Sequence, residues 1–375
     1  MKRKILIMGD NNLETVGGEQ ESTKIILKNL KNHFEFHVIQ PGDTIKPISG
    51  INYKYLSEQD RLKKLIKNPF LFIKYILDTK KIINEINPNI IHTQAQVSFF
   101  IIGMLIKFKS LKNNNLVVVH TERGLYRKYN LFFKRIFYLF LKNTDLLITT
   151  TEYNKLDWEK ALKNRNSFRG EIKVIENTAG DLFEKFDDMK KIKITDEYVI
   201  GFAGRYCDWK NWPLAVEIIE KVYRDTKNVK VKMAIGCLDK TSEKETIEMF
   251  KKIEKITNGN FDGYINLNLE EMNNFYYDLD FFILTSKTNT ESFGRTLVEA
   301  MSRKTVVFST DAGGTTEVIG NSNNIFEQSE DVTKKILFYM NNKDEMNAEK
   351  KYNLERVKSV YSLKNNIIKH QNLYS

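Results

Sequence analysis

The chain has 375 residues, a length that favours two domains over one core. Its 41% hydrophobic and 12% aromatic content favours a packed globular protein and excludes a largely disordered one. The net charge of +11 calls for an anionic partner, and nucleic acid, a membrane surface and phosphorylated ligands are the candidates.

Cysteine usage and the N-terminus indicate a cytoplasmic protein. The two cysteines, Cys207 and Cys237, form no C-x-x-C pair and have no histidine cluster beside them, which argues against a disulfide framework or a zinc site. The N-terminus runs directly into an apolar strand that is too short for a signal-peptide core. The longest apolar run, residues 97–106, is about half a membrane span. No zinc-finger spacing or RNP aromatic pattern is present, so nucleic acid is not expected as a partner.

The chain opens as a strand, a glycine turn and a helix. Lys4–Met8 is predicted as a buried strand and residues 19–30 as a helix, with Gly17 and Gly18 in the turn between them. This order is typical of nucleotide-binding folds, but the G-x-G-x-x-G pattern of a dinucleotide site is absent. The two glycine amides could contact a phosphate, or they could form an ordinary tight turn.

Further apolar runs predict a parallel sheet in the first half. The predicted strands are residues 36–39, 89–92, 116–119, 145–149 and 172–175, and residues 61–86 are predicted as a helix interrupted at Pro69. His120 directly follows the strand over residues 116–119, and Glu122 and Arg123 come next. Open α/β sheets bind ligands beyond the carboxyl ends of their strands, so His120 is a candidate site residue. A structural role in the loop is the alternative.

Two stretches of the first half combine aromatic and basic residues. One apolar stripe of a helix predicted over residues 129–141 consists of Tyr129, Phe132, Phe133, Ile136, Phe137 and Phe140. Lysines and arginines occupy its other faces, and residues 61–81 are similarly basic and aromatic. Either the stripe packs into the core below a solvated basic face, or its aromatic residues reach into an anionic lipid surface. The sequence leaves both interpretations open.

The second half begins with a strand followed by two cations. Residues 198–203 predict the strand, and Arg205 and Lys210 follow it in an R-x4-K pattern before the next predicted helix. Two fixed cations at a strand-to-helix turn can neutralise the charge that builds on a leaving diphosphate. Further along, Asp278 and Asp280 have the form of a D-x-D metal motif. They lead into a buried strand, so no metal site is predicted there.

Residues 280–320 predict a strand, a helix, a second strand and a further helix. Glu291 lies in the loop before the first helix and Glu299 lies inside it, eight positions further on. This spacing does not stack the two carboxylates on one helical face, so they are expected to bind different parts of one ligand. Gly294 precedes the first helix and Gly313-Gly314 opens the second, an arrangement typical of phosphate binding.

The pattern E-S-F-G-x4-E-A-M, followed by a Gly-Gly turn and preceded by R-x4-K, resembles retaining GT-B glycosyltransferases of family 4. The resemblance covers essentially the whole chain. It implies an α/β protein of the GT-B fold, in which two Rossmann-like domains face each other across a cleft and the C-terminal helix crosses back to the first. The expected divisions are residues 1–185 on the acceptor side, 186–355 for the nucleotide sugar, and 356–375 for the crossing helix.

The same resemblance assigns roles to individual residues. Arg205 and Lys210 are expected on the diphosphate, Glu299 on the ribose hydroxyls and Glu291 on the donor sugar. His120 is expected on the opposite wall, facing the reacting sugar. The remaining expected donor contacts are Gly17, Gly18, Tyr264, Ser292, Phe293, Gly294, Arg295 and Thr296, and the expected acceptor-side residues are Glu122, Arg123 and Tyr126. No metal or other cofactor is expected.

The function implied is transfer of a hexose or N-acetylhexosamine from a nucleotide sugar, a UDP-sugar by preference, with retention of configuration. The expected acceptor is a cell-surface glycan precursor, free or lipid-linked, of the lipopolysaccharide, capsule or teichoic-acid type. The expected location is the cytoplasm or the inner face of the plasma membrane. Two alternatives are a nucleotide-sugar epimerase and a catalytically silent subunit. The second rests on departures from the family pattern at residues 176–181 and 302–305.

Overall fold

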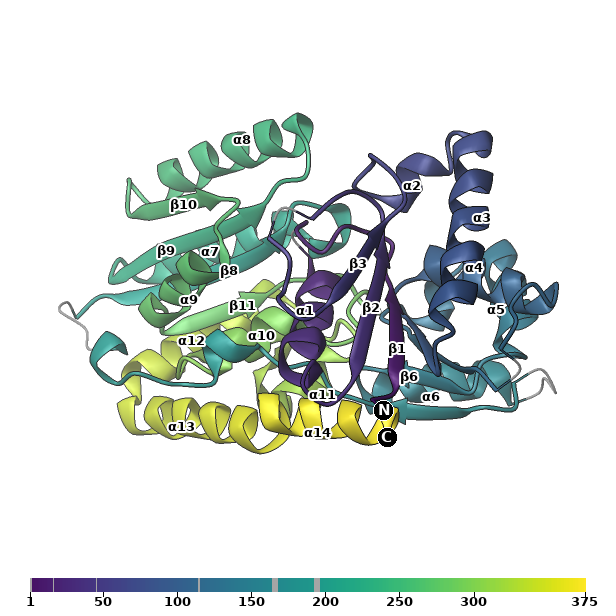
Figure 1. Ribbon diagram of the computed structural model, residues 1–375. Helices are drawn as coiled ribbons and strands as arrows, with labels where there is room; N and C mark the ends of the chain where they lie inside the picture. Colours follow the sequence, from purple (N-terminus) through teal and green to yellow (C-terminus); the bar gives the residue numbers. More distant parts are fainter. Residues whose placement is uncertain (1, 16, 45, 114, 164–167, 192–195) are drawn as a thin grey trace. The chain divides into compact units, whose positions relative to one another are not determined.

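The computed structural model of the chain describes residues 2–15, 17–44, 46–113, 115–163, 168–191 and 196–375. Within these ranges the apolar runs form two parallel sheets, of seven and six strands. The chain divides into a first unit, Met1–Asn177 with Lys364–Ser375, and a second unit, Thr178–Leu363. The predicted α/β class with two Rossmann-like sheets is therefore confirmed (Figure 1).

The sheet of the first unit has the order β3-β2-β1-β4-β5-β6-β7. Its strands are β1 (Lys4–Met8), β2 (Glu35–Gln40), β3 (Asn52–Tyr55), β4 (Ile90–Thr93), β5 (Val117–Thr121), β6 (Leu146–Thr149) and β7 (Glu171–Val174). The sheet grows outward in both directions from the pair β1 and β4. Open α/β sheets bind ligands beyond the carboxyl ends of such a central pair, so the residues that follow β1, β4 and β5 are the candidates in this unit.

Helices cover both faces of this sheet. They are α1 (Gly18–Leu30), α2 (Leu62–Leu65), α3 (Pro69–Ile86), α4 (Gln96–Lys107), α5 (Leu131–Leu141), α6 (Glu152–Leu162) and α14 (Leu363–Tyr374). Side chains of α1 and α14 share one core cluster with Ile5 and Ile7, while those of α2, α3 and α4 share another with Leu6 and Met8. Successive strand residues point to opposite faces, so α1 and α14 cover one face and α2–α4 the other.

The last helix completes the first unit. Tyr374 is fully buried, and its hydroxyl lies 2.6 Å from His92 Nδ1. Arg3 Nη1 donates to the Tyr374 carbonyl at 3.3 Å, so the two ends of the chain meet at one edge of this unit (Figure 1). The prediction that the C-terminal helix packs on the first domain is confirmed.

The sheet of the second unit has the order β10-β9-β8-β11-β12-β13. Its strands are β8 (Tyr198–Arg205), β9 (Val229–Gly236), β10 (Phe261–Ile265), β11 (Phe281–Leu284), β12 (Val306–Thr310) and β13 (Ile325–Phe326). Its helices are α7 (Trp212–Asp225), α8 (Lys240–Ile256), α9 (Leu269–Asp278), α10 (Arg295–Met301), α11 (Thr315–Ile319), α12 (Ser329–Asn341) and α13 (Lys343–Val360). Here β8 and β11 are the central pair, and both predicted site loops follow them.

The boundaries between the units lie eight residues away from those expected. The first falls after Asn177 rather than after residue 185, because the segment that follows packs on the second unit. There Phe183 is buried, with its ring 6.1 Å from that of Tyr276. The second falls after Leu363 rather than after residue 355, because Val357 at the end of α13 lies in the core of the second unit.

Three features of the first unit were not predicted, or only in part, from the sequence. Strand β3 is mostly exposed at the sheet edge and lacks the apolar alternation that would have predicted it. The apolar run over residues 97–106 forms the largely buried helix α4. The core interpretation of the aromatic stripe applies only to the second half of α5, where Phe137 and Phe140 are buried, whereas Phe132 in the first half is 67% exposed. Within the described ranges, no helix is long and apolar enough to cross a bilayer.

Candidate functional site

An ion pair lies at the carboxyl ends of the central strands of the second unit. Lys210 ends the short turn η4 (Asp208–Lys210) after β8, and Glu291 lies in the loop after β11. Lys210 Nζ is 2.9 Å from Glu291 Oε1, and the two side chains are 12% and 16% exposed. The sequence predicted both residues in the site but not their contact. Because the pair is mostly buried, salt screens it little, and each charge holds the other in place.

Backbone hydrogen bonds fix the position of Glu291. Its amide donates to the Ala312 carbonyl at 2.9 Å, and its carbonyl accepts from the Gly314 amide at 2.9 Å. Ser286 Oγ donates to Glu291 Oε1, also at 2.9 Å. The loop after β11 is therefore tied to the Gly313-Gly314 turn after β12, as two neighbouring parallel strands allow.

Glu299 is held at both carboxylate oxygens. Arg295 Nε donates to its Oε1 at 2.9 Å, and the Tyr276 hydroxyl donates to its Oε2 at 2.9 Å. Burial, with the neighbouring Glu299 charge, raises the pKa of the Tyr276 hydroxyl, so this tyrosine remains a donor. A carboxylate has about four acceptor positions, so Glu299 can still accept hydrogen bonds from a ligand while its orientation is fixed.

The start of α10 carries five predicted donor contacts. Gly294 has φ 89°, in the left-handed region that favours glycine, and lies just before the helix. Ser292 lies in the loop, and Phe293 is buried and anchors it to the core. Arg295 Nη1 and Thr296 Oγ1 are buried and have no hydrogen-bond partner among the described residues. Buried polar atoms are normally hydrogen-bonded, so these two could serve a ligand.

Arg205 and Tyr264 make ring contacts of their own. The exposed Arg205 ends β8, with its guanidinium carbon 5.8 Å from the centroid of the Trp209 ring, a cation–π distance. Tyr264 lies on the edge strand β10, and its ring packs edge-on to Phe275 with centroids 6.4 Å apart. The structure therefore brings together Lys210, Glu291 and their loops, and it leaves Tyr264 two strands away from β8.

The two aspartates of the D-x-D pattern are engaged by lysines. Asp280 Oδ1 lies 2.9 Å from Lys350 Nζ, and its other oxygen accepts from the Val199 amide at 3.0 Å. Asp278 Oδ2 lies 2.9 Å from Lys232 Nζ. These contacts give both carboxylates a structural role at the start of β11.

In the first unit, His120 is fully buried. Its ring stacks on Phe99 with centroids 4.2 Å apart, and its Nδ1 lies 2.9 Å from Thr93 Oγ1. Its Nε2 lies 3.4 Å from Glu122 Oε2. This enclosed position fits the structural role better than direct contact with a sugar, because a ligand would need to displace packed side chains. The expected role of His120 in facing the donor stays a prediction.

The three expected acceptor-side residues differ in their surroundings. Glu122 is 1% exposed and accepts from the Gly124 amide at 2.6 Å and the Tyr129 hydroxyl at 2.8 Å. The Tyr126 ring packs edge-on to a tryptophan, Trp158, at 5.2 Å. Glu122 and Tyr126 therefore support the fold of this region.

Arg123 bridges the carboxyl ends of two strands. It donates to the Gln94 carbonyl at 2.6 Å and to the Gln94 side-chain oxygen at 2.8 Å. Gln94 follows β4 and Arg123 follows β5, so this pair lies where an α/β sheet binds ligands.

Gly17 and Gly18 lie at the start of α1, as predicted. A Cβ added to Gly17 would meet the side-chain oxygen of Gln20, whereas nothing lies within 4 Å of one added to Gly18. Gly17 is thus packed on the first turn of the helix, and Gly18 faces open space. The position of Gly18 is compatible both with a phosphate contact and with an ordinary tight turn.

Two carboxylates near the carboxyl end of the central strand β1 were not predicted from the sequence. Asp10 follows β1 and accepts from the amides of Val97 and Ser98 at 2.9 and 2.7 Å, at the start of α4. Glu19, in the first turn of α1, accepts from the Asp10 amide at 3.1 Å and from Asn11 Nδ2 at 2.9 Å. A signal was available for Asp10, since it lies directly after the first strand, whereas Glu19 lies in the first turn of the helix that follows.

Burial and the charge of Asp10 raise the pKa of Glu19 from its ordinary 4.5 to about 7. Between these two pKa values the folded protein holds a proton on Glu19 that the unfolded chain has already lost. We expect this group to lower the free energy of unfolding by about 1–3 kcal/mol as the pH rises from about 5 to about 8. Glu19→Gln keeps the shape of the side chain and one acceptor oxygen, and it should remove this pH-dependent loss of stability. Urea unfolding at about pH 5 and about pH 8 measures it.

Histidines with lowered pKa act in the opposite direction over part of this range. Burial lowers the pKa of His370 to about 4 and that of His92 below its ordinary value, so they favour folding as the pH rises. Both histidines are present in the wild type and in Glu19→Gln, so their effect cancels in the difference between the two proteins. An equal stability difference at both pH values would refute the assignment.

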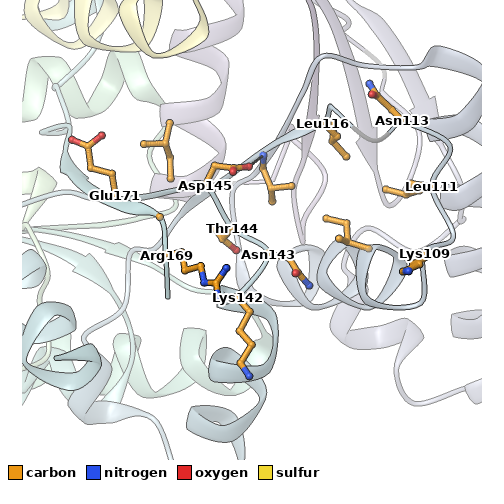
Figure 2. Close-up of a pocket in the computed structure, with 14 residues that line it drawn as sticks. Lys109, Leu111, Asn113, Leu116, Lys142, Asn143, Thr144, Asp145, Arg169 and Glu171 are labelled. Carbon is orange, nitrogen blue, oxygen red and sulfur yellow. Dashed lines mark hydrogen bonds between the residues drawn. The ribbon is translucent and has the colours of Figure 1, made fainter. Parts of the chain in front are cut away.

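A separate cavity of about 890 Å³ lies at the opposite edge of the sheet of the first unit (Figure 2). It is bounded by Leu116, Asp145 and Glu171, at the amino ends of β5, β6 and β7. Asp145 Oδ2 accepts from the Val118 amide at 2.7 Å, which fixes neighbouring strands together. No predicted site residue lines this cavity.

Two family models match this chain. Residues 184–356 match the model described as glycosyl transferases group 1, and residues 13–151 match the model described as glycosyl transferase 4-like. The first match lies wholly within the second unit, and the second match lies within the first unit. An uncharacterized glycosyltransferase of Methanocaldococcus jannaschii is 24% identical over 342 residues, which is 88% of this chain and 86% of that protein.

Solved structures share the fold over the full length. A glycosyltransferase from Rickettsia africae superposes with a TM-score of 0.78 at 20% identity, covering 100% of this chain and 98% of that one. HepE from Anabaena, in complex with UDP, superposes with a TM-score of 0.78 at 16% identity, covering 99% of each chain. At such identities the likeness concerns the fold.

Proposed function

Because this chain belongs to the group 1 glycosyl transferases and has the GT-B fold, we propose that it transfers a hexose or N-acetylhexosamine from a UDP-sugar with retention of configuration. The acceptor in this proposal is a cell-surface glycan precursor of the lipopolysaccharide, capsule or teichoic-acid type. The donor binds at the carboxyl edge of the second unit.

The contact between Lys210 and Glu291 is the observation that carries the proposal. A nucleotide sugar places an anionic diphosphate directly beside neutral sugar hydroxyls. The pair offers a cation and a carboxylate with 2.9 Å between Nζ and Oε1, so a diphosphate and a sugar hydroxyl can each find a binding partner at adjoining positions. In this assignment Lys210 binds the diphosphate and Glu291 accepts hydrogen bonds from the sugar hydroxyls.

Other residues of the second unit complete the donor site in this proposal. Glu299, oriented by Tyr276 and Arg295, accepts hydrogen bonds from the ribose hydroxyls. Arg205, at the end of β8, supplies a second cation for the diphosphate. Buried donors near the start of α10, such as Thr296 Oγ1, are available to the diphosphate or the sugar.

Retention is proposed to follow a front-face displacement. The bond between the anomeric carbon and the phosphate oxygen breaks, and the acceptor hydroxyl bonds to the same face of the sugar. The departing phosphate oxygen takes the acceptor proton. Negative charge grows on the diphosphate during this step, so a fixed cation such as Lys210 lowers the barrier more than it strengthens ground-state binding. No metal ion is required in this scheme.

Uridine is proposed as the base on the strength of one structural relative. HepE has been solved with UDP, with UDP and glucose, and with UDP-glucose. The acceptor class is supported by the basic and aromatic stretches of the first unit, residues 61–81 and 127–142. An acceptor with anionic groups, or one presented at an anionic membrane, would suit these stretches.

The donor site is tested by thermal unfolding with UDP, GDP and ADP on wild type and Glu299→Gln. A nucleotide at about 100 times its Kd stabilises the folded state by about 2.7 kcal/mol. We expect a shift with UDP alone, and an at least tenfold higher Kd for UDP in Glu299→Gln, because the variant loses the charged acceptor for the ribose. Glu254→Gln, at an exposed position on α8, is the matched control and should bind UDP like wild type.

The reaction itself is followed by NMR of a UDP-sugar with candidate acceptors. A product with the anomeric configuration of the donor supports retention, and an inverted product overturns it. Conversion of the UDP-sugar into its epimer without any acceptor would favour the epimerase alternative. Absence of a thermal shift with every nucleotide would remove the proposed donor site.

A further inference from the structure

Helix α3 presents large apolar side chains to solvent along one stripe. Phe70 is 84% exposed, Ile73 54% and Leu77 58%. Their spacing places them on one side of the helix. The opposite side, with Tyr75 and Ile83, is buried against the sheet. Helix α3 therefore has two apolar faces, one buried in the core and one exposed to solvent.

The first residues of α5 also expose apolar side chains to solvent. Leu131 is 75% exposed and Phe132 67%, while Phe137 and Leu141 near the other end of the helix are buried. The exposed Leu131 and Phe132 therefore bury little apolar area in the core. A contiguous exposed apolar patch on a protein indicates an interaction surface.

These two stripes lie in the same layer of the first unit. Residues of α3 and α4 form one core cluster with Leu6 and Val118, and α5 packs on α4 through Phe100, whose ring lies 6.0 Å from that of Phe133. The three helices thus stand on one face of the sheet, as Figure 1 also shows for α3, α4 and α5. Their outer sides form the surface of that layer.

Cations surround the exposed apolar residues. Residues 61–81 contain seven lysines and arginines against one aspartate, and residues 127–142 contain five and no acidic residue. Lys67, Lys74 and Arg135 are exposed. We call Phe70, Ile73, Leu77, Leu131 and Phe132, with these three cations, the basic apolar face.

We propose that the basic apolar face docks on an anionic lipid bilayer, with the phenylalanine and leucine side chains at the acyl boundary and the cations at the headgroups. Apolar burial and attraction to anionic lipid act together in such a surface. A second copy of the chain is disfavoured as the occupant, because a symmetric contact would place like charges opposite each other. Nucleic acid is disfavoured because aliphatic Ile73, Leu77 and Leu131 offer it no stacking.

The test is sedimentation of the full chain with vesicles of pure phosphatidylcholine and with vesicles containing about one-third phosphatidylglycerol. We expect binding to the anionic vesicles at about 50 mM salt and little binding at about 500 mM. Lys67→Glu with Lys74→Glu should weaken binding by about 30-fold or more, since each cation near an anionic bilayer contributes about fivefold. Phe70→Ser with Phe132→Ser should weaken it about tenfold or more.

Matched variants in the second unit serve as controls. Lys252→Glu with Lys255→Glu changes two exposed lysines of α8, and Phe338→Ser changes a phenylalanine that is 51% exposed on α12. Both variants should bind vesicles like wild type. Their melting temperatures are measured first, so that only folded proteins are compared.

Two results would overturn the docking proposal. One is the absence of binding to anionic vesicles. The other is self-association in analytical ultracentrifugation that Phe70→Ser with Phe132→Ser abolishes, which would assign the face to a second copy. Because the readout is binding and not turnover, neither result bears on the glycosyl transfer proposed above.

Discussion

Replacing Lys210 by methionine is expected to lower kcat by about 10²–10³-fold, the usual cost of removing one fixed group that stabilises developing charge. Methionine preserves most of the length and the apolar stem of lysine, which packs so closely on Gly204 that a Cβ added there would lie 3.1 Å from Lys210 Cε. The KM for the donor should change much less than kcat, because the diphosphate gains charge only as the glycosidic bond breaks. The measurement is release of nucleoside diphosphate under saturating donor.

The matched control is Lys252→Met, at an exposed position on α8. It should keep the kcat of the wild type. Because the variant at position 210 leaves Glu291 without its cation, unfolding should be measured for both proteins, and a common melting temperature within a few degrees establishes that the site alone is affected. A kcat within about tenfold of wild type for Lys210→Met would contradict the proposed role in leaving-group stabilisation.

Arg303→Met is expected to lower the free energy of unfolding by about 3–5 kcal/mol, as removal of one partner from a buried polar network usually does. Arg303 is fully buried. It donates to Asn273 Oδ1 at 2.6 Å, to the Leu182 carbonyl at 2.8 Å and to the Phe183 carbonyl at 3.2 Å. Methionine fills much of the space but leaves these acceptors without a donor. Thermal and urea unfolding measure the change.

The neighbouring Lys304→Met is the control. Lys304 Nζ lies 2.8 Å from Asp188 Oδ1, but the two side chains are 33% and 82% exposed, and such surface pairs contribute about 0–1 kcal/mol. A loss below about 1 kcal/mol for Arg303→Met would show that the network is replaceable. The contacts of Arg303 also give the departure from the family pattern at residues 302–305 a structural explanation, since this arginine anchors the segment that enters the second unit.

Much of the fold follows from local sequence pattern. The apolar runs of four to eight residues, separated by polar turns and helical stretches, predicted most of the buried strands, because a strand covered on both faces must be apolar along its length. Pro69 begins α3 as expected, since proline cannot donate within a helix and suits its first turn. The exposed strand β3 and the two-residue β13 escaped because neither carries such a run.

The candidate donor site was predictable to the level of its residues but not of their contacts. Arg205, Lys210 and Glu291 stand out because they lie in loops that follow strands, and Glu299 because of its spacing from Glu291. The hydrogen bond from Tyr276 to Glu299 joins residues 23 positions apart, which no local pattern reports. Asp10 was overlooked although it lies directly after the first strand, and Glu19 was overlooked in the first turn of the next helix.

The sequence by itself determined the two parallel sheets, the loops that follow their central strands and the family of the chain, because these depend on hydrophobic period and short-range spacing. Only the tertiary structure decided which side chains are enclosed. It buried His120 and Glu122, exposed Phe70 and Phe132, and enclosed Glu19 beside the charge of Asp10, which together raise the pKa of Glu19. Burial and electrostatics depend on residues that are distant in the chain and adjacent in the fold, so the chemical environment of a side chain is fixed only when the helices and sheets pack together.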